Sequence, residues 1–296
     1  MRWKRLFVIV AVMVLLGWAV DIRGKISTSK KPGPSLAVVS AVMMEADTGK
    51  WLYTSNGKEA LPPASMSKMM TETLILDSIQ SGELAWDDTI AASAYAAQVG
   101  GAGMELTEGQ RVSVKELFDA MAIHSANDAA VALAENIAGS ETEFVKRMNQ
   151  KAQEIGLSDD TYFANATGLS STDIESYATA AADGDTVMTA EDVALLARYL
   201  IETHPEILKI TKKATASAES EPDLLKTTNE MLPGQRFGTK GNDGLKTGYT
   251  KQAGYCFTGT TIIDGRRYIT VVMGASTPEA RFEETKKLLD YAKESL

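Results

Sequence analysis

The chain has 296 residues, of which 44% are hydrophobic and 23% charged, so it can form a sizeable core in one large domain or in two closely joined lobes. Its formal net charge is -9 although its first 25 residues are basic, which leaves an acidic body and argues against nucleic-acid binding. The single cysteine excludes an intramolecular disulfide, and with only two histidines it argues against a catalytic zinc site.

The N-terminal segment, residues 1–20, has the pattern of an export signal. Basic residues precede an apolar run from Leu6 to Val20, which has no polar face to suit a buried core helix. The run is short for a bilayer core of about 30 Å, which favours a cleaved signal peptide. However, no small-x-small cleavage site follows Val20, which favours an uncleaved anchor. We therefore expect an exported protein whose N-terminal segment is either removed or kept as a membrane anchor.

Residues 21–35 end in lysines, prolines and a glycine, a composition that predicts a solvated tether. The folded domain is expected over residues 36–296. It begins with two β-prone segments, 37–45 and 50–54, on either side of a turn at 47–49. This pattern is typical of a β-hairpin.

Two prolines end this extended region, and an apolar helical pattern opens at Ser65. Four middle segments carry apolar residues at helix spacing: 114–123, 128–137, 141–155 and 190–201. The period changes to that of strands in 255–263 and 268–273, and an amphipathic helix is expected over 278–296. This order predicts an α+β fold: an antiparallel sheet formed by the N- and C-terminal segments, flanked by helices, with an inserted, mainly helical lobe.

Ser65 and Lys68 form a Ser-x-x-Lys pair at the start of the first expected helix. A spacing of three puts both side chains on one face, so the amine can reach the hydroxyl and act as its base. Pairs with the same spacing begin at Ser27 and Ser55, but the first lies in the tether and the second in a turn. Taken alone, the pair at Ser65 also fits an N-capping serine with a solvated lysine.

A second motif, Ser125 to Asn127, lies between two expected helices. A second hydroxyl beside a nucleophilic serine can relay a proton to a leaving nitrogen, and an amide can bind a peptide carbonyl. By itself, such a triplet is a loop as often as a functional site.

A third motif, Lys246, Thr247 and Gly248, opens a β-prone stretch and is followed by Tyr249. Its cation and hydroxyl suit an anionic terminus, and its glycine lets a substrate backbone lie close to the strand. The three motifs, in this order, match the set that is typical of class A β-lactamases and penicillin-binding proteins.

The sequence resembles the serine D-Ala-D-Ala carboxypeptidases, the low-molecular-mass penicillin-binding proteins of peptidase family S11. Residues 63–71 are similar to the family's nucleophile segment and residues 243–250 to its third motif, and residues 163–169 and 188–192 resemble further family segments. The resemblance runs from about residue 36 to the C-terminus. It implies a fold like that of β-lactamases and transpeptidases.

This resemblance implies a two-step acyl transfer to water. Ser65, deprotonated by Lys68, attacks the carbonyl between the two terminal D-alanines of a peptidoglycan stem peptide, and water hydrolyses the acyl-enzyme. Ser125 helps to relay protons. The resemblance further implies covalent inhibition by β-lactams, a location outside the cytoplasm, either anchored to the cell membrane through the N-terminal segment or secreted to the cell wall, and no cofactor or metal.

The resemblance also implies a binding set. Backbone N–H groups of Ser65 and Tyr249 hold the oxyanion, by analogy with the family. The side chain of Arg281, at the start of the last helix, either joins the carboxylate site or is an ordinary surface charge. The residues implied to bind substrate are Asn127, Lys246, Thr247, Gly248, Tyr249 and Arg281.

Two alternative functions share the same motifs. A serine β-lactamase needs fast deacylation, for which class A enzymes use a glutamate, and four candidates in the helical region fit helix surfaces better: Glu135, Glu141, Glu143 and Glu154. A non-enzymatic penicillin-sensing or wall-binding domain often lacks a motif residue, and none is missing here. A Ser-His-Asp hydrolase is disfavoured because the only histidines are His124 and His204 and no Gly-x-Ser-x-Gly elbow occurs.

The sequence departs from the family at two points. His124 precedes the second motif where an apolar residue or proline is expected, so the local shape there is open. Many relatives carry an additional β-rich domain after the catalytic one, whereas here the helix expected over 278–296 comes last. If it is retained, the N-terminal segment is expected to take over the role of anchor.

Overall fold

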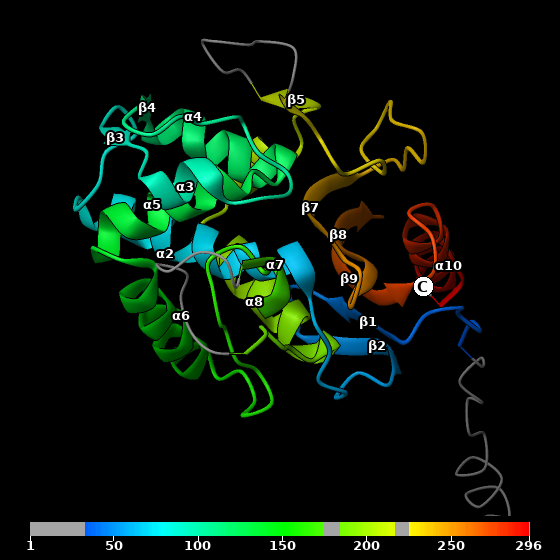
Figure 1. Ribbon diagram of the computed structural model, residues 1–296. Coiled ribbons are helices and arrows are strands. Elements are labelled where there is room, and N and C mark those ends of the chain that lie inside the picture. Colours follow the sequence, from blue (N-terminus) through cyan, green and yellow to red (C-terminus); the bar gives the residue numbers. More distant parts are fainter. Residues whose placement is uncertain (1–32, 175–183, 217–224, 296) are drawn as a thin grey trace, which may run out of the picture. The chain divides into compact units, whose positions relative to one another are not determined.

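Strands from both ends of the described chain form the main sheet of this computed structural model, which describes residues 33–174, 184–216 and 225–295. The strand order is β2-β1-β9-β8-β7, and every neighbouring pair is antiparallel (Figure 1). The strands are β1 (Ser40–Glu45), β2 (Lys50–Ser55), β7 (Asn242–Thr250), β8 (Gly254–Ile263) and β9 (Arg266–Ala275). The predicted α+β fold, with a sheet built from both terminal segments, is confirmed.

The residues expected to direct export lie outside the described ranges. Segment 1–20 and the tether up to residue 32 are not described. The fold and the site belong to the unit Pro34–Glu294. In the described part of the chain, no helix combines the length and the apolar character needed to cross a membrane.

Helices pack against the sheet and form the inserted lobe, which also carries two small two-stranded sheets (Figure 1). The helical elements are η1 (Ala64–Ser67), α2 (Lys68–Ser81), α3 (Ala94–Gln98), α4 (Val114–Asp119), η2 (Ala120–His124), α5 (Asn127–Ala138), α6 (Glu141–Ile155), α7 (Ser171–Ile174), α8 (Ala190–Thr203), α9 (Ile207–Thr211) and α10 (Ala280–Ser295). The small sheets pair β3 (Thr89–Ala91) with β4 (Arg111–Ser113) and β5 (Thr215–Ala216) with β6 (Leu225–Lys226).

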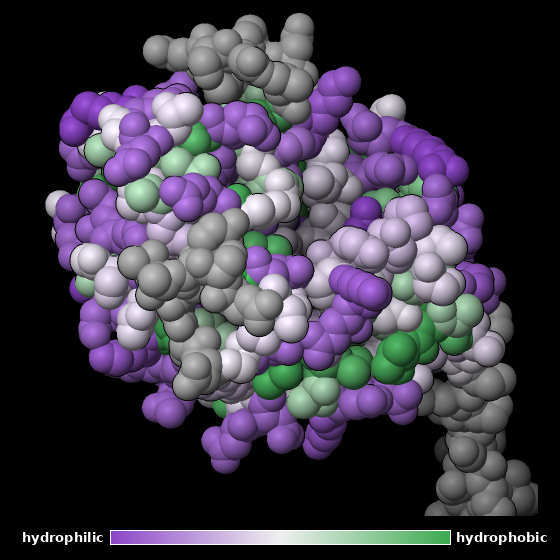
Figure 2. Space-filling model, viewed as in Figure 1, coloured by the Kyte–Doolittle hydropathy of each residue, from purple (hydrophilic) through white to green (hydrophobic). Residues whose placement is uncertain are grey.

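Strand β1 connects two hydrophobic clusters. Val42 and Met44 belong to the cluster shared with the helical lobe, whereas Ala41 and Met43 belong to the cluster that includes residues of α10. Successive side chains of a strand point to opposite faces, so β1 buries both of its faces. Strand β2 is an edge strand with partly exposed residues, and Figure 2 shows hydrophobic residues at the surface near β1 and β2 on an otherwise largely hydrophilic face.

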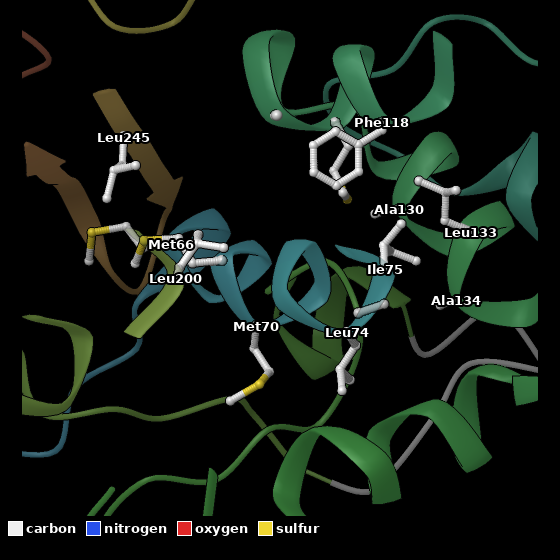
Figure 3. Packing of buried hydrophobic residues seen from close by; sticks show 14 of the residues in the cluster. Met66, Met70, Leu74, Ile75, Phe118, Ala130, Leu133, Ala134, Leu200 and Leu245 are labelled. Carbon is white, nitrogen blue, oxygen red and sulfur yellow. The ribbon is translucent and has the colours of Figure 1, made fainter. Parts of the chain in front are cut away.

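Helix α2 runs through the interior of the lobe. Its Met70, Leu74 and Ile75 belong to one hydrophobic cluster with Phe118 of α4 and Ala130 of α5 (Figure 3). Because neighbours cover this helix on most sides, its polar residues at 68, 71, 72 and 73 are buried as well. The packing of α2 therefore removes a lysine and a glutamate from water.

The observed elements follow the predicted ones closely, with differences in two of the expected helices. The helix expected to open at Ser65 is a 3-10 turn, η1, and the α-helix proper begins at Lys68. The segment expected as one helix over 114–123 is α4 followed by the wider π-helical turn η2. Cys256, the single cysteine, lies fully buried in β8, and burial raises the pKa of its thiol to about 11.

Candidate active site

The amine of Lys68 lies where three parts of the chain meet. Its Nζ is 2.9 Å from Ser65 Oγ, 2.6 Å from Asn127 Oδ1 and 2.7 Å from the carbonyl oxygen of Thr167. The side chain is fully buried. A neutral amine has two hydrogens and one lone pair, so it can donate to the two carbonyl-type oxygens and accept the O–H of Ser65.

The surroundings of Lys68 favour the neutral amine. Burial lowers the pKa of Lys68 well below its usual value, and the nearby charge of Lys246 lowers it further. Glu72 and Asp128 act in the opposite direction without overcoming these effects. A buried amine whose pKa is lowered in this way and that lies within hydrogen-bonding distance of a hydroxyl has the geometry of a general base.

The second motif lies at the junction of η2 and α5. Ser125 ends η2 with a left-handed backbone (φ 71°) and is 6% exposed. Two residues later, Asn127 uses both ends of its amide: Oδ1 accepts from Lys68, and Nδ2 donates to the carbonyl of Gly100 at 2.7 Å. Asn127 therefore joins the base to the loop that follows α3.

Asp128 fixes the same loop from the first turn of α5. Its carboxylate accepts the backbone N–H groups of Met104, Leu106 and Ala129. These bonds to the charged form hold down the pKa of Asp128, but burial outweighs them and raises it. The loop is consequently held by two successive side chains, one of which also contacts Lys68.

The third motif lies against the Ser65 turn along β7. A Cβ atom added to Gly248 would lie 2.5 Å from the carbonyl oxygen of Pro63 and 3.2 Å from the backbone N of Ser65. Only glycine permits this approach of strand and turn. Lys246 is 1% exposed, and Thr247 Oγ1 is hydrogen-bonded to Thr228 Oγ1 at 2.6 Å.

Tyr249 and Arg281 lie beside this motif. Tyr249 is 52% exposed and stacks on Tyr255, with ring centroids 4.3 Å apart. Arg281 donates from Nη1 to the carbonyl of Gly248 at 3.4 Å, and its guanidinium lies 5.6 Å from the centre of the Tyr255 ring. Its Nε is buried and has no hydrogen-bond partner among the described residues. This is not the environment of an ordinary surface charge.

His124, the unexpected residue before the second motif, points to a neighbouring strand. Its Nδ1 lies 3.0 Å from the carbonyl oxygen of Lys226, at the end of β6. His204 is the C-cap residue of α8, and its Nε2 lies 2.8 Å from Asp77. Neither contact belongs to a Ser-His-Asp arrangement with Ser65.

Sequence reasoning missed two buried glutamates near the site. Glu141, expected at a helix surface, is fully buried, and it accepts the backbone N–H of Ala166 at 2.9 Å. It thereby fixes the segment that presents the Thr167 carbonyl to Lys68. Glu72, one helical turn after Lys68, is 1% exposed. Its four-residue spacing from Lys68 was the available signal.

Solved structures similar to this chain define its class of fold. Penicillin-binding protein D2 from Listeria monocytogenes, in the ampicillin-bound form, has a TM-score of 0.77 and 35% identity, over 89% of this chain and 100% of that chain. A peptidoglycan synthesis regulatory factor, PBP3, from Streptococcus pneumoniae has a TM-score of 0.83 and 35% identity, over 88% of this chain and 74% of that chain. The fold is that of the penicillin-binding proteins and β-lactamases.

The family follows from the sequence comparisons. The model of peptidase family S11, described as D-alanyl-D-alanine carboxypeptidase, matches residues 26–277. D-alanyl-D-alanine carboxypeptidase DacF of Bacillus subtilis is 41% identical over 86% of this chain and 61% of its own length. DacD of Escherichia coli is 34% identical over 88% of this chain and 64% of its own length. This chain belongs to peptidase family S11, and it spans less than two thirds of the length of these two relatives.

Proposed function

We propose that this chain is a serine D-Ala-D-Ala carboxypeptidase that removes the terminal D-alanine from peptidoglycan stem pentapeptides outside the cytoplasm. The observation that supports it most directly is the 2.9 Å contact of the buried Lys68 Nζ with Ser65 Oγ. The family relatives DacF and DacD carry the name of this activity. The catalytic domain is assigned to residues 36–296.

Acylation begins with Lys68 as a neutral amine. Its Nζ takes the proton of Ser65, and Oγ attacks the carbonyl carbon between the last two D-alanines to form a tetrahedral intermediate. Backbone N–H groups of Ser65 and Tyr249 hold the oxyanion. The close approach of Gly248 to the Ser65 turn supports this pairing, because it brings the two backbone segments together. The C–N bond then breaks, and the leaving nitrogen receives the proton from Lys68 through the Ser125 hydroxyl.

Deacylation repeats these steps with water as the nucleophile. Lys68 takes a proton from water, whose oxygen attacks the ester carbonyl. Collapse of the intermediate breaks the bond to Ser65 Oγ, which regains its proton. A β-lactam enters by the same acylation step, and the resulting acyl-enzyme is the basis of covalent inhibition.

Substrate recognition is assigned to β7 and α10. Lys246, Thr247 and Arg281 bind the terminal carboxylate with two cations and a hydroxyl, while Gly248 and Tyr249 offer backbone groups to the substrate chain. The hydrogen bond from Arg281 Nη1 to the Gly248 carbonyl is long, at 3.4 Å, which supports this role because the guanidinium retains donors for a ligand. Asn127 orients the substrate through the base and the loop that it holds.

The cellular setting follows from the residues before the domain. Residues 1–20 direct export and are either cleaved or kept as a membrane anchor, and residues 21–35 act as the tether. The relatives named D-alanyl-D-alanine carboxypeptidase support a location outside the cytoplasm, where the proposed substrate lies. Analysis of the mature N-terminus by mass spectrometry decides between the two: a start at or near Met1 supports the anchor, and a start beyond Val20 contradicts it.

The β-lactamase and the non-enzymatic alternatives receive no specific support. Glu141, one candidate for a deacylating glutamate, is engaged with the Tyr95 hydroxyl and the Ala166 N–H. The named relatives are carboxypeptidases.

The deciding experiment incubates the purified protein with a stem pentapeptide and with penicillin in parallel. Released D-alanine and hydrolysed lactam are measured, with Ser65→Ala as the matched control. Fast release of D-alanine with slow lactam turnover, both lost in Ser65→Ala, supports the carboxypeptidase. Rapid lactam turnover instead indicates a β-lactamase, and neither activity indicates a binding domain.

A further inference from the structure

A buried carboxylate lies behind the two lysines of the site. Glu72 follows Lys68 by four residues in α2, which is one helical turn, so both side chains lie on the same face of the helix. Glu72 is 1% exposed, and its Oε1 is buried without a hydrogen-bond donor among the described residues. Buried carboxylates without donors are rare, because the charged form loses its hydration. The nearby positive charges of Lys246 and Lys68 favour the charged carboxylate and so offset part of this loss.

Lys246 approaches this group from strand β7 of the main sheet. Side chains two apart on a strand point to the same face, and the face of β7 that carries Gly248 lies against Pro63 and Ser65 of the nucleophile turn. Lys246 shares that face and is 1% exposed. Its side chain is consequently directed towards the turn and the start of α2, where Lys68 and Glu72 are buried.

The charged neighbours of this group come from four elements. Within α2, Lys68 and Glu72 face each other; β7 contributes Lys246, α5 contributes Asp128, and α10 contributes Arg281. Asp128 acts on Lys68 alone and is already held by backbone N–H groups. Arg281 acts on Lys246 as a like charge. Glu72 is the carboxylate that acts on both lysines.

We propose that Glu72 is a positioning residue whose carboxylate is the buried counter-charge that keeps Lys246 an ammonium while Lys68 stays a neutral amine. The two lysines need opposite protonation states, because one has to take a proton and the other has to bind an anion. The one negative charge of Glu72 can balance only one of the two amines, and the carboxylate of Asp128 is already held by backbone N–H groups. The proposal rests on the proposed roles of Lys68 and Lys246.

The pKa values give this arrangement a defined pH range. Burial raises the pKa of Glu72 to about 7, although Lys246 and Lys68 both oppose the rise. Burial lowers the pKa of Lys246 to about 8, and among the charges Glu72 is the first to raise it. Above pH 7 the ionised Glu72 therefore supports the Lys246 ammonium. Well below pH 7 Glu72 is protonated and contributes no charge, so replacing it there by a neutral isostere changes little.

The test is the pH profile of acylation in the variant Glu72→Gln, with the second-order rate constant for a fluorescent penicillin measured from pH 5.5 to 9.5 on the full chain. Below pH 6 the variant is expected to react within about twofold of the unaltered protein. Above pH 7 the alkaline limb of the variant's pH–rate profile is expected to shift to lower pH by about one unit. At pH 9 this shift corresponds to a rate about tenfold lower than that of the unaltered protein.

Two further variants separate charge from structure. Glu72→Asp retains the carboxylate at a greater distance, so its profile is expected between the other two. Glu284→Gln makes the same change at another buried glutamate, on α10. Glu284 is 5% exposed, its Oε2 has no hydrogen-bond partner among the described residues, and its Oε1 is paired with Lys287. This variant is expected to keep the original profile, with any loss confined to thermal stability.

A loss by the same factor at every pH in Glu72→Gln, or no loss at all, overturns the proposal. If Glu72→Gln does not fold, the same criterion applies to Glu72→Asp, whose loss must be confined to pH above 7. Ser65→Ala distinguishes this failure from failure of the proposed function. Labelling that persists in Ser65→Ala refutes the nucleophile assignment, whereas a silent Ser65→Ala with an unchanged Glu72→Gln profile refutes only the role of Glu72.

Discussion

The two walls of the candidate site, one from the helical lobe and one from the sheet, satisfy their polar groups in different ways. On the lobe wall, Lys68 Nζ has three oxygen neighbours within 2.9 Å. On the sheet wall, the hydrogen bonds of Lys246 and Arg281 to the described residues are long, at 3.4 Å each, and both go to backbone carbonyls of the same motif.

This difference separates chemistry from recognition. A general base works best when its geometry is fixed before the substrate arrives, because orientation then costs nothing during the reaction. Anion binding instead requires donors that are not already used, since a donor satisfied by the protein gains little from a ligand. The lobe wall therefore fixes the position of one amine. The sheet wall keeps its two cations, Lys246 and Arg281, available as donors, whereas the hydroxyl of Thr247 is already bonded to Thr228.

The largest effect is expected from removing the amine that the lobe wall holds. Lys68→Met removes the amine but keeps an unbranched side chain, so Ser65 loses its base and the two carbonyl-type oxygens of Asn127 and Thr167 lose their donor. The rate of acylation by a fluorescent penicillin is expected to fall by about 10³-fold or more. Stopped-flow measurement of labelling, with folding checked by thermal melting, tests this.

A matched lysine serves as the control for that loss. Lys115→Met removes an amine that is partly exposed and ion-paired with Asp119 on α4. It is expected to label at the original rate. Equal rates in Lys68→Met and the unaltered protein contradict the assignment of the base.

An intermediate effect is expected where the walls meet. Gly248→Ala puts a Cβ 2.5 Å from the Pro63 carbonyl oxygen, so β7 must move away from the Ser65 turn. A displacement of about 1 Å between reacting groups is expected to lower acylation about 10²-fold. The measurement is again the labelling rate, together with the melting temperature.

Gly265→Ala, in the β8–β9 turn, is the control for glycine replacement. Its backbone has a positive φ of 78°, and an added Cβ meets nothing within 4 Å. The substitution is expected to destabilise the fold by about 1 kcal/mol through backbone strain and to leave the labelling rate unchanged. If Gly248→Ala labels as fast as Gly265→Ala, the contact between the walls has no catalytic importance.

The regular elements were predictable because their signals are local. The helix over Glu141–Ile155 and the strand pair on either side of Asp264 and Gly265 follow from apolar spacing and turn chemistry, and the observed bounds agree closely. The strand order could not be predicted from local signals, since the pairing of β1 with β9 joins segments more than 200 residues apart. The 3-10 turn at Ser65 also depends on contacts with a distant strand.

The site was predictable to the extent that its residues form spaced motifs. The spacing of Ser65 and Lys68 singles them out, and their side chains lie 2.9 Å apart. Glu72 and Glu141 are not singled out in this way, because a glutamate in a helical pattern is ordinarily exposed. Their burial depends on tertiary packing: α2 is covered by its neighbours, and Glu141 binds a loop residue 25 positions away. A charged residue at a position where the apolar helix pattern predicts a buried side chain is the sequence signal for such a glutamate.

The smallest expected effect concerns the available donors of the sheet wall. Arg281→Gln removes one cation but leaves Lys246 and Thr247, so the KM for a peptide ending in a free D-alanine carboxylate is expected to rise about tenfold, which corresponds to about 1.4 kcal/mol, with kcat little changed. The same peptide with a C-terminal amide carries no charge for Arg281 to bind, so the two proteins should then have similar KM values. Arg236→Gln, an exposed arginine paired with Glu279, is the matched control. An equal rise in KM for both peptides contradicts carboxylate recognition, since it shows that Arg281 supports the shape of the wall and not the binding of charge.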